Sequence, residues 1–251
     1  MSTQLSIHMT RNHIPYQMLQ QNNDVRTQFI NTFLTSTTTT TTTTSFALLR
    51  KHTVLQWLCG DTSFLFGPSF EHNTKSKTKD NEQCKKLEDE WGQSMLAHIR
   101  PDLKTSGQWT TIFGEKLHSE LQLMLGQTYI KPRNIHGYQP DGETNDYIWE
   151  VKSQTHFTPG TAGEKILGVP FKYADVPILY KKPLKIVCLG CAERDGRQKY
   201  GILPGGDKVT ENRQKILDFW RTELNIEYIG ATDLMQQILQ NIQAQNIQAQ
   251  T

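Results

Sequence analysis

Three residues near the middle of the chain have side chains that can bind a divalent cation and move a proton. Asp141 and Glu150 are carboxylates, and Lys152 lies two positions after Glu150. Because side chains alternate between the faces of a β-strand, a strand predicted over residues 147–152 places Glu150 and Lys152 on one face. A short strand that ends near Asp141, followed by a turn, would bring Asp141 beside Glu150. The sequence therefore predicts that two carboxylates and one ammonium group converge.

This combination suits the hydrolysis of a phosphodiester bond. Mg²⁺ prefers hard oxygen ligands, which Asp141 and Glu150 supply, and the backbone carbonyl of Val151 is a candidate third ligand. Bound Mg²⁺ can help to generate the nucleophile and stabilise charge on the attacked phosphate. Lys152 is expected to hydrogen-bond the attacking water and to offset negative charge. The alternative interpretation is an ordinary surface ion pair between Glu150 and Lys152.

The elements that must position these residues follow from the spacing of apolar side chains. Period-2 and period-3.6 patterns alternate along the chain, which is typical of an α/β sandwich. A buried strand is predicted over residues 184–189. Helices are predicted over residues 87–99, 111–125, 161–167 and 211–224, with a shorter helical element within 46–66.

Two glutamates on the helix predicted over residues 111–125 face different surroundings. Phe113, Leu117, Leu121 and Met124 form an apolar stripe along this helix. At about 100° per residue, Glu120 falls inside the stripe, and Glu115 lies on the opposite, solvated side. A carboxylate among core residues needs a cation, a metal or a proton as partner. Helical geometry therefore singles out Glu120.

The catalytic residues lie in a motif that resembles a known nuclease signature. Pro140-Asp141, eight intervening residues and Glu150-Val151-Lys152 are similar to the PD-(D/E)xK motif of the restriction-endonuclease-like nucleases. Segments around the motif resemble a group of type II restriction enzymes over residues 80–201, about half of the chain. These segments are Gly107-Gln108-Trp109, Phe113-Gly114-Glu115, Gly137-Tyr138-Gln139, Tyr147-Ile148-Trp149, Gly160 to Gly168 and Lys182 to Val187.

The resemblance implies a fold, a cofactor and partners. The expected fold is a mixed central sheet flanked by helices, with Mg²⁺ as cofactor and a homodimer that cuts both strands of DNA. A type II restriction enzyme also implies a separate methyltransferase that protects the host genome. An acidic residue on the helix before the hairpin becomes a candidate accessory metal ligand, and helical geometry favours Glu120 over Glu115.

A group of lysines after the predicted catalytic strand is a candidate DNA-binding surface. Phosphate contacts by such residues would give affinity without reading sequence, and the alternative is a solvated loop. The candidates are Lys165, Lys172, Lys181, Lys182 and Lys185. Before them, Gly160 and Thr161 open the helix predicted over 161–167, where backbone amides could meet a phosphate or Thr161 could cap the helix.

Composition and sequence patterns divide the whole chain into four regions. Residues 1–45 are rich in Gln, Asn and Thr and are predicted to be a disordered or variable extension. A helical region at 46–104 and a nuclease core at 105–232 follow, and 233–251 contains a repeated Gln-Asn-Ile-Gln-Ala unit, which predicts a low-complexity tail. No apolar run approaches the eighteen or so residues of a membrane span, so an intracellular protein without a membrane partner is expected.

Two other functions stay open from the sequence. A repair or recombination nuclease could use the same fold, because fold and catalytic strand do not fix the biological substrate. A DNA-binding module without catalysis would retain the carboxylates for structural reasons only. Formal net charge is +2, which neither requires nor excludes a nucleic-acid partner.

Overall fold

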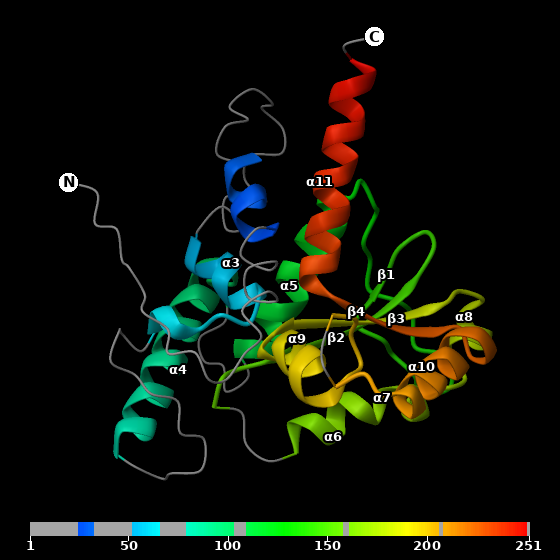
Figure 1. The fold of residues 1–251 in the computed structure, drawn as a ribbon, viewed down its shortest axis with the longest axis horizontal. Helices are drawn as coiled ribbons and strands as arrows, with labels where there is room; N and C mark the ends of the chain where they lie inside the picture. The colour runs from blue at the N-terminus through cyan, green and yellow to red at the C-terminus, as the bar shows by residue number, and fades with distance from the viewer. Residues whose placement is uncertain are drawn as a thin grey trace.

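The structure is a computed structural model that describes residues 25–32, 52–65, 79–102, 109–157, 161–205 and 208–249. The threonine run at 37–44 and most of the predicted extension lie outside these residues. Helices cover both faces of one four-stranded sheet (Figure 1). The predicted mixed α/β class is confirmed at this level.

One antiparallel and two parallel pairings build the sheet, which has the order β1-β2-β3-β4. The strands are β1 (Gly142–Glu143), β2 (Ile148–Gln154), β3 (Leu184–Gly190) and β4 (Ile226–Gly230). Strands β2 and β3 match the two predictions closely. Strand β4 is absent from the sequence predictions, because its five residues directly follow a helix and carry no turn signal beyond Asn225.

The strand expected to end near Asp141 instead begins after it, at Gly142. The turn expected to contain Gly142, Asn145 and Asp146 lies at residues 144–147 between β1 and β2, so it includes Asn145 and Asp146, and only Gly142 belongs to the strand instead. The ring and hydroxyl of Tyr129 lie directly against Gly142, where a Cβ atom would collide with them. This close approach explains a glycine inside the strand.

Helices form two layers around the sheet (Figure 1). On one face lie α3 (His52–Leu58), α4 (Lys79–Ile99), α5 (Trp109–Met124) and α11 (Ala231–Gln248), with the 3-10 turn η1 (Ser63–Leu65) after α3. On the other lie α6 (Ala162–Leu167), α7 (Val169–Lys172), α8 (Val176–Tyr180) and α10 (Glu211–Glu223). Helix α9 (Cys191–Asp195) continues directly from β3 into a π-helical turn, η2 (Gly196–Tyr200). The predicted helices correspond to α4, α5, α6 and α10, and the shorter predicted element corresponds to α3, whereas α7, α8, α9 and α11 are additional.

Side chains of β2 contribute to two separate hydrophobic cores. Trp149 and Val151 belong to the core under α3, α4, α5 and α11, and Ile148 belongs to the core under α6–α8 and α10. The predicted alternation along this strand is therefore confirmed. Because both faces of the strand are covered, Glu150 is buried rather than solvated, with only 4% of its surface exposed.

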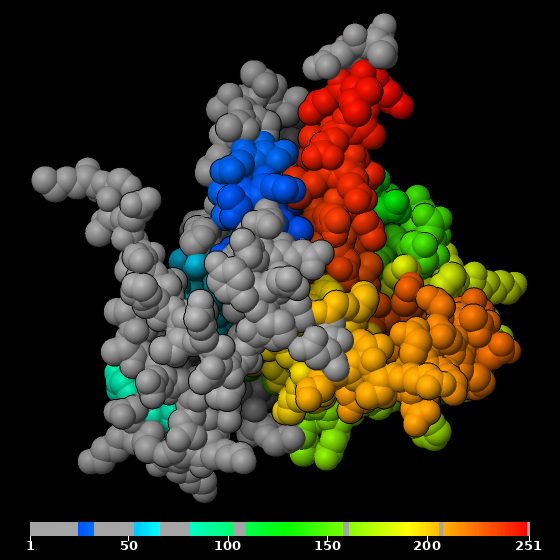
Figure 2. All heavy atoms as spheres, in the orientation of Figure 1, coloured from blue at the N-terminus to red at the C-terminus, as the bar shows by residue number. Residues whose placement is uncertain are grey.

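The predicted extension at 1–45 and the predicted tail at 233–251 both contribute to the same structure. Residues 25–32 are helical, and the side chain of Phe29 is buried in the first core. Helix α11 occupies most of the predicted low-complexity tail, and its Leu234 and Ile238 are buried in that core too. Figure 2 shows residues 25–32 and α11 together on one face of the molecule. Repetitive sequence at 233–251 is therefore compatible with an amphipathic helix.

Described helices include none with the length and apolar character required to cross a membrane.

Candidate active site

The antiparallel pairing of β1 with β2 brings Asp141 close to Glu150. Gly142 pairs with Trp149, and the backbone amide of Asp141 donates a hydrogen bond of 3.0 Å to the Trp149 carbonyl. One position further, the register places Asp141 opposite Glu150. The Asp141 carboxylate also accepts a hydrogen bond of 2.7 Å from the Val151 amide. The hairpin thus holds Asp141 against the middle of β2, as the sequence predicts.

The Glu150 carboxylate is buried and only half satisfied. One oxygen, Oε1, lies 2.5 Å from the Lys152 ammonium. The other, Oε2, is buried and has no hydrogen-bond partner. Burial raises the pKa of Glu150, the Lys152 charge lowers it, and the negative charge of Asp141 raises it further. A buried carboxylate oxygen without a donor is a position at which a cation would lower the free energy.

Lys152 is placed to act on a group bound beside Glu150. About a fifth of its side chain is exposed, at 22%, whereas that of Glu150 is 6% exposed. The ammonium also lies 3.4 Å from the Val151 carbonyl oxygen. Because the N–H and C=O of one strand residue point to the same side, the Val151 carbonyl faces the strand neighbour that supplies Asp141. Lys152, Asp141 and this carbonyl therefore surround one small region.

Helix α5 brings Glu115 to the same region. The helix approaches β2 closely at Gly114, where an added Cβ would lie 2.6 Å from the Ser153 side chain. Burial raises the pKa of the next residue, Glu115, and the charge of Asp141 raises it further, while Lys131 and Lys152 lower it. These interactions place Glu115 within electrostatic range of two of the predicted catalytic residues.

Glu120 has a different partner. Its carboxylate is 2% exposed, as its position in the apolar stripe predicts, and it lies 2.5 Å from the Lys116 ammonium one turn earlier on α5. Its second oxygen is buried without a hydrogen-bond partner. The Lys116 pair resembles that of Glu150 with Lys152, so it does not by itself separate the two acids. The charges of Asp141 and Lys152 act on Glu115, which favours Glu115 over Glu120 as the acid that belongs to the candidate site, the reverse of the preference from helical geometry.

Two tyrosines near the carboxylates were not predicted from the sequence. Burial raises the pKa of Tyr129, with contributions from Asp141, Glu115 and Glu150. Burial likewise raises the pKa of Tyr173, with contributions from Glu150 and Asp141. Tyr129 precedes β1 and Tyr173 follows α7, so neither shares a motif with β2. Only the fold brings them there.

Across the described residues, no three or more His, Cys, Asp or Glu side chains gather closely enough to hold a metal ion by themselves. The candidate site offers two carboxylates, Asp141 and Glu150, together with the Val151 carbonyl. That set suits Mg²⁺, which is usually bound through one or two carboxylates with water and substrate oxygens completing its coordination. Zn²⁺ would instead require nitrogen or sulfur ligands.

Comparison of the chain with protein-family models, with curated proteins and with solved structures found no match.

The five candidate DNA-binding lysines fall into two groups. Lys182 lies 2.6 Å from Glu143 and donates to the Thr144 carbonyl, and Lys185 lies 2.9 Å from Glu227. The others are exposed at the surface: Lys165, Lys172 and Lys181. Lys172 is also close enough to Glu150 to lower the pKa of that carboxyl. Lys172 is thus the member of the group that the fold brings to the candidate site.

The segment that opens α6 gives little support for either role predicted for it. Gly160 lies outside the described residues, and the Thr161 side chain makes no capping hydrogen bond to α6. Helix α6 has only six residues. The predicted phosphate contact therefore stays a prediction.

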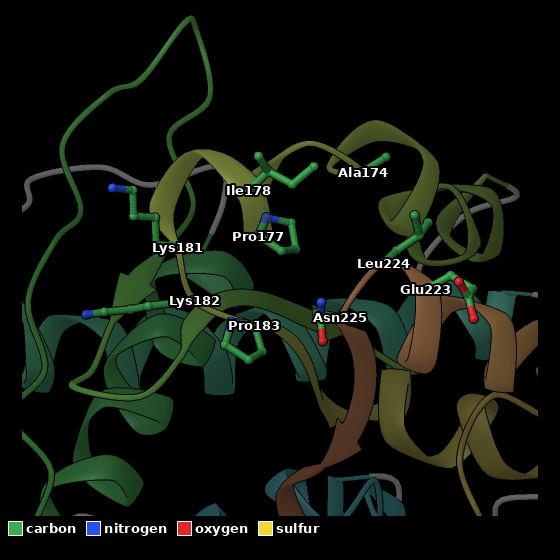
Figure 3. Close-up of a pocket in the computed structure, with 9 residues that line it drawn as sticks. All are labelled: Ala174, Pro177, Ile178, Lys181, Lys182, Pro183, Glu223, Leu224 and Asn225. Carbon is green, nitrogen blue, oxygen red and sulfur yellow. The ribbon is translucent and has the colours of Figure 1, made fainter.

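A pocket of about 290 Å³ lies between α8 and the residues that precede β3 and β4 (Figure 3). Lys181 and Lys182 line it with Asn225, and both lysine side chains point away from Glu223 (Figure 3). The pocket is at the amino-terminal ends of the parallel strands, whereas Glu150 lies in the middle of β2. It is therefore separate from the candidate active site.

Proposed function

We propose that this chain is a type II restriction endonuclease that hydrolyses phosphodiester bonds of double-stranded DNA with Mg²⁺ as cofactor. The observation that carries the proposal is the pairing of Asp141 with Glu150 at the β1–β2 hairpin, with Lys152 beside them. The buried Glu150 oxygen Oε2 adds support, because a bound cation would satisfy it. The motif resemblance over residues 80–201 supplies the enzyme class.

Asp141, Glu150 and the Val151 carbonyl would hold Mg²⁺ in this proposal, and Glu115 is the accessory acid. When bound, Mg²⁺ neutralises charge on the scissile phosphate and favours ionisation of the attacking water. The surrounding cores keep the two carboxylates in place, since Trp149 and Val151 anchor β2 on one face and Ile148 on the other. Such a preorganised site needs little rearrangement during the reaction.

Lys152 acts on the attacking water and on the phosphate in this proposal. Its ammonium group is partly exposed and adjacent to the carboxylates, so it can donate a hydrogen bond to the attacking water or to a phosphate oxygen. Its positive charge also offsets the repulsion between the phosphate and the two carboxylates. Lys152 therefore contributes to turnover more than to cation binding.

The complete enzyme would be a homodimer, because each strand of a duplex needs its own catalytic centre. Restriction-endonuclease-like architecture is the proposed finer description of the observed mixed α/β sheet. A cognate DNA methyltransferase would be the functional partner in the cell.

Digestion of a plasmid tests the proposal. Wild-type protein with Mg²⁺ is expected to give discrete fragments, and Glu150→Ala should give none while still binding a DNA duplex. Lys152→Ala should lose turnover with little change in the Mg²⁺ concentration needed for half-maximal rate. A matched control is Glu120→Gln, which removes a buried carboxylate from α5 outside the proposed catalytic group.

The pattern of products separates the rival functions. Cuts confined to branches, nicks or ends would indicate a repair nuclease and overturn the restriction assignment. Binding without any metal-dependent cleavage would indicate a DNA-binding module and overturn the enzyme assignment. Sequencing the ends of discrete fragments would give the recognition site and the cut position.

A further inference from the structure

Residues 130–139, which lead into Asp141, form a second hairpin before the β1–β2 hairpin. At its base, Ile130 and Glu143 exchange two backbone hydrogen bonds of 3.0 and 2.9 Å, so the hairpin continues from the edge of the sheet. At its tip, Ile135 and Tyr138 exchange two more, also of 3.0 and 2.9 Å. The segment is therefore closed by backbone bonds at both ends.

The tip has the backbone of a tight two-residue turn. His136 and Gly137 have φ values of 50° and 87°. Positive φ at both central residues is the geometry of a type I′ turn, which matches the twist of a hairpin. The Asn134 side chain accepts a hydrogen bond of 3.0 Å from the Gly137 amide. These bonds fix the conformation of the tip.

Tyrosines attach the hairpin to α8 and its neighbours. The Tyr180 hydroxyl lies 2.6 Å from the Arg133 carbonyl oxygen and 2.9 Å from that of Tyr138. The Tyr138 hydroxyl donates to Asp175 over 3.3 Å. Because the backbone of Arg133 is held in this way, its exposed side chain projects from a fixed point.

The hairpin is cationic. Residues 126–140 contain no Asp or Glu, and they include Lys131, Arg133 and His136, all exposed. Among the described residues, no ion pair within 4.0 Å involves Lys131 or Arg133. By contrast, Lys182 and Lys185 of the predicted DNA-binding group have nearby carboxylate partners. The positive charge of the hairpin is thus available to an external anion.

We propose that residues 130–139 bind the phosphate backbone of a DNA duplex through Arg133 and Lys131, and so hold the duplex beside Asp141. This inference rests on the proposed function, because it takes double-stranded DNA as the substrate. Glu115, Asp141 and Glu150 place negative charge where a phosphate must approach, and cations on a neighbouring rigid element offset that repulsion. A hairpin that is already ordered loses little conformational entropy on binding.

DNA binding without divalent metal tests the inference separately from cleavage. The probe is a fluorescein-labelled duplex of mixed sequence, and the readout is fluorescence anisotropy over a series of salt concentrations. Arg133→Ala is expected to weaken binding by about tenfold and to reduce the slope of log K against log salt by about one. Arg133→Lys should keep most of the affinity and the slope, because a phosphate accepts a point charge.

Arg100→Ala is the matched control. Arg100 is exposed, directly follows α4 and pairs with Asp102 over 2.6 Å, so unlike Arg133 it already has an acidic partner. Its replacement removes the same charge and should leave the salt slope unchanged. Circular dichroism of each variant checks that the fold is retained, which is expected because Arg133 contributes its backbone carbonyl to the Tyr180 contact.

The outcomes for the hairpin and for the enzyme are distinguishable. Wild-type cleavage together with unchanged binding by Arg133→Ala would overturn the inference and leave the proposed function intact. Wild-type binding without cleavage, with weaker binding by Arg133→Ala, would support the inference and overturn the nuclease. Weaker binding by Arg133→Ala with an unchanged salt slope would overturn phosphate contact, since the loss of a phosphate contact lowers that slope by about one.

Discussion

The Asp141 carboxylate accepts a hydrogen bond from the backbone amide of Val151, with 2.7 Å between the two atoms. This bond crosses from the residue before β1 to the middle of β2, where the short strand provides no backbone partner. It fixes Asp141 beside Glu150 and keeps its charge close enough to raise the pKa of that carboxyl. One side chain therefore closes the hairpin and completes the candidate metal site.

Replacing Asp141 by Asn and by Ala separates these two roles. Both variants should lose cleavage by about a thousandfold or more, because a metal ligand supplies several kcal/mol to the transition state. Asn keeps an oxygen that can accept a hydrogen bond from the Val151 amide, so the free energy of unfolding of Asp141→Asn should be close to that of the wild type. Asp141→Ala should lower the free energy of unfolding by about 1.5–3 kcal/mol, the order expected for a hydrogen bond to a charged group. Plasmid cleavage and urea unfolding check this pair, and wild-type cutting by Asp141→Asn would remove the ligand assignment.

The two candidate accessory acids lead to opposite expectations. Glu115→Gln should lower cleavage by about ten- to a hundredfold and raise the Mg²⁺ concentration for half-maximal rate, as expected when support for a metal site is lost. Glu120→Gln should leave that concentration near wild type, because Glu120 pairs with Lys116. Magnesium titration of the cleavage rate measures both. A larger shift for Glu120→Gln would restore the assignment made from helical geometry.

Strand β2 is predictable from the sequence because its signals are local. Alternation over residues 147–152 assigns Glu150 and Lys152 to one face, and the structure places them there. The position of Asp141 is also accessible, since it needs only a tight hairpin. The buried environment of Glu150 is harder to predict, because the helices that cover this face of β2 are α6 to α8 and α10, which lie later in the chain.

The proximity of Glu115 to the candidate site could not be predicted from the residues of its own helix. A helical wheel separates Glu120 from Glu115 by their average surroundings, but it contains no information about Gly114. That glycine allows α5 to approach Ser153 of β2 closely, so a half-buried residue beside it reaches the carboxylates. Likewise, Tyr129 and Tyr173 join the site only through tertiary packing. The apolar face of α11 is likewise difficult to predict from the repetitive sequence at 233–251, because its role depends on the core against which the helix packs.

Burial of His118 predicts a specific dependence of stability on pH. Burial lowers the pKa of His118 to about 3, below its ordinary value of 6.5. The unfolded chain therefore binds more protons than the folded chain between these two values, so stability is complete above about pH 6.5 and falls as the pH drops toward 3. Each pH unit in this window changes the free energy of unfolding by up to about 1.4 kcal/mol.

His118→Gln should flatten that dependence. Glutamine can still hydrogen-bond to Gln122 and Tyr129, the two partners of the His118 ring, and it does not titrate. Urea unfolding at several pH values between 4 and 7 would show a shallower slope than wild type. Parallel slopes for the two proteins would contradict burial of a neutral histidine. The lost ring packing against Trp149 affects all pH values equally and so does not imitate the result.

Lys172 and Lys185 provide the last contrast, since one faces the candidate site and the other is held within the sheet. Lys172→Ala should weaken binding of a DNA duplex and reduce the salt slope by about one, because an exposed cation near Glu150 is lost. Lys185 instead lies 2.9 Å from Glu227 and 4.7 Å from the centre of the Tyr147 ring. Lys185→Ala should cost under about 1 kcal/mol of stability and leave the salt slope unchanged. Anisotropy and urea unfolding of the same preparations decide between them: equal loss of slope in both variants would show that Lys185 leaves its intramolecular partner to contact phosphate.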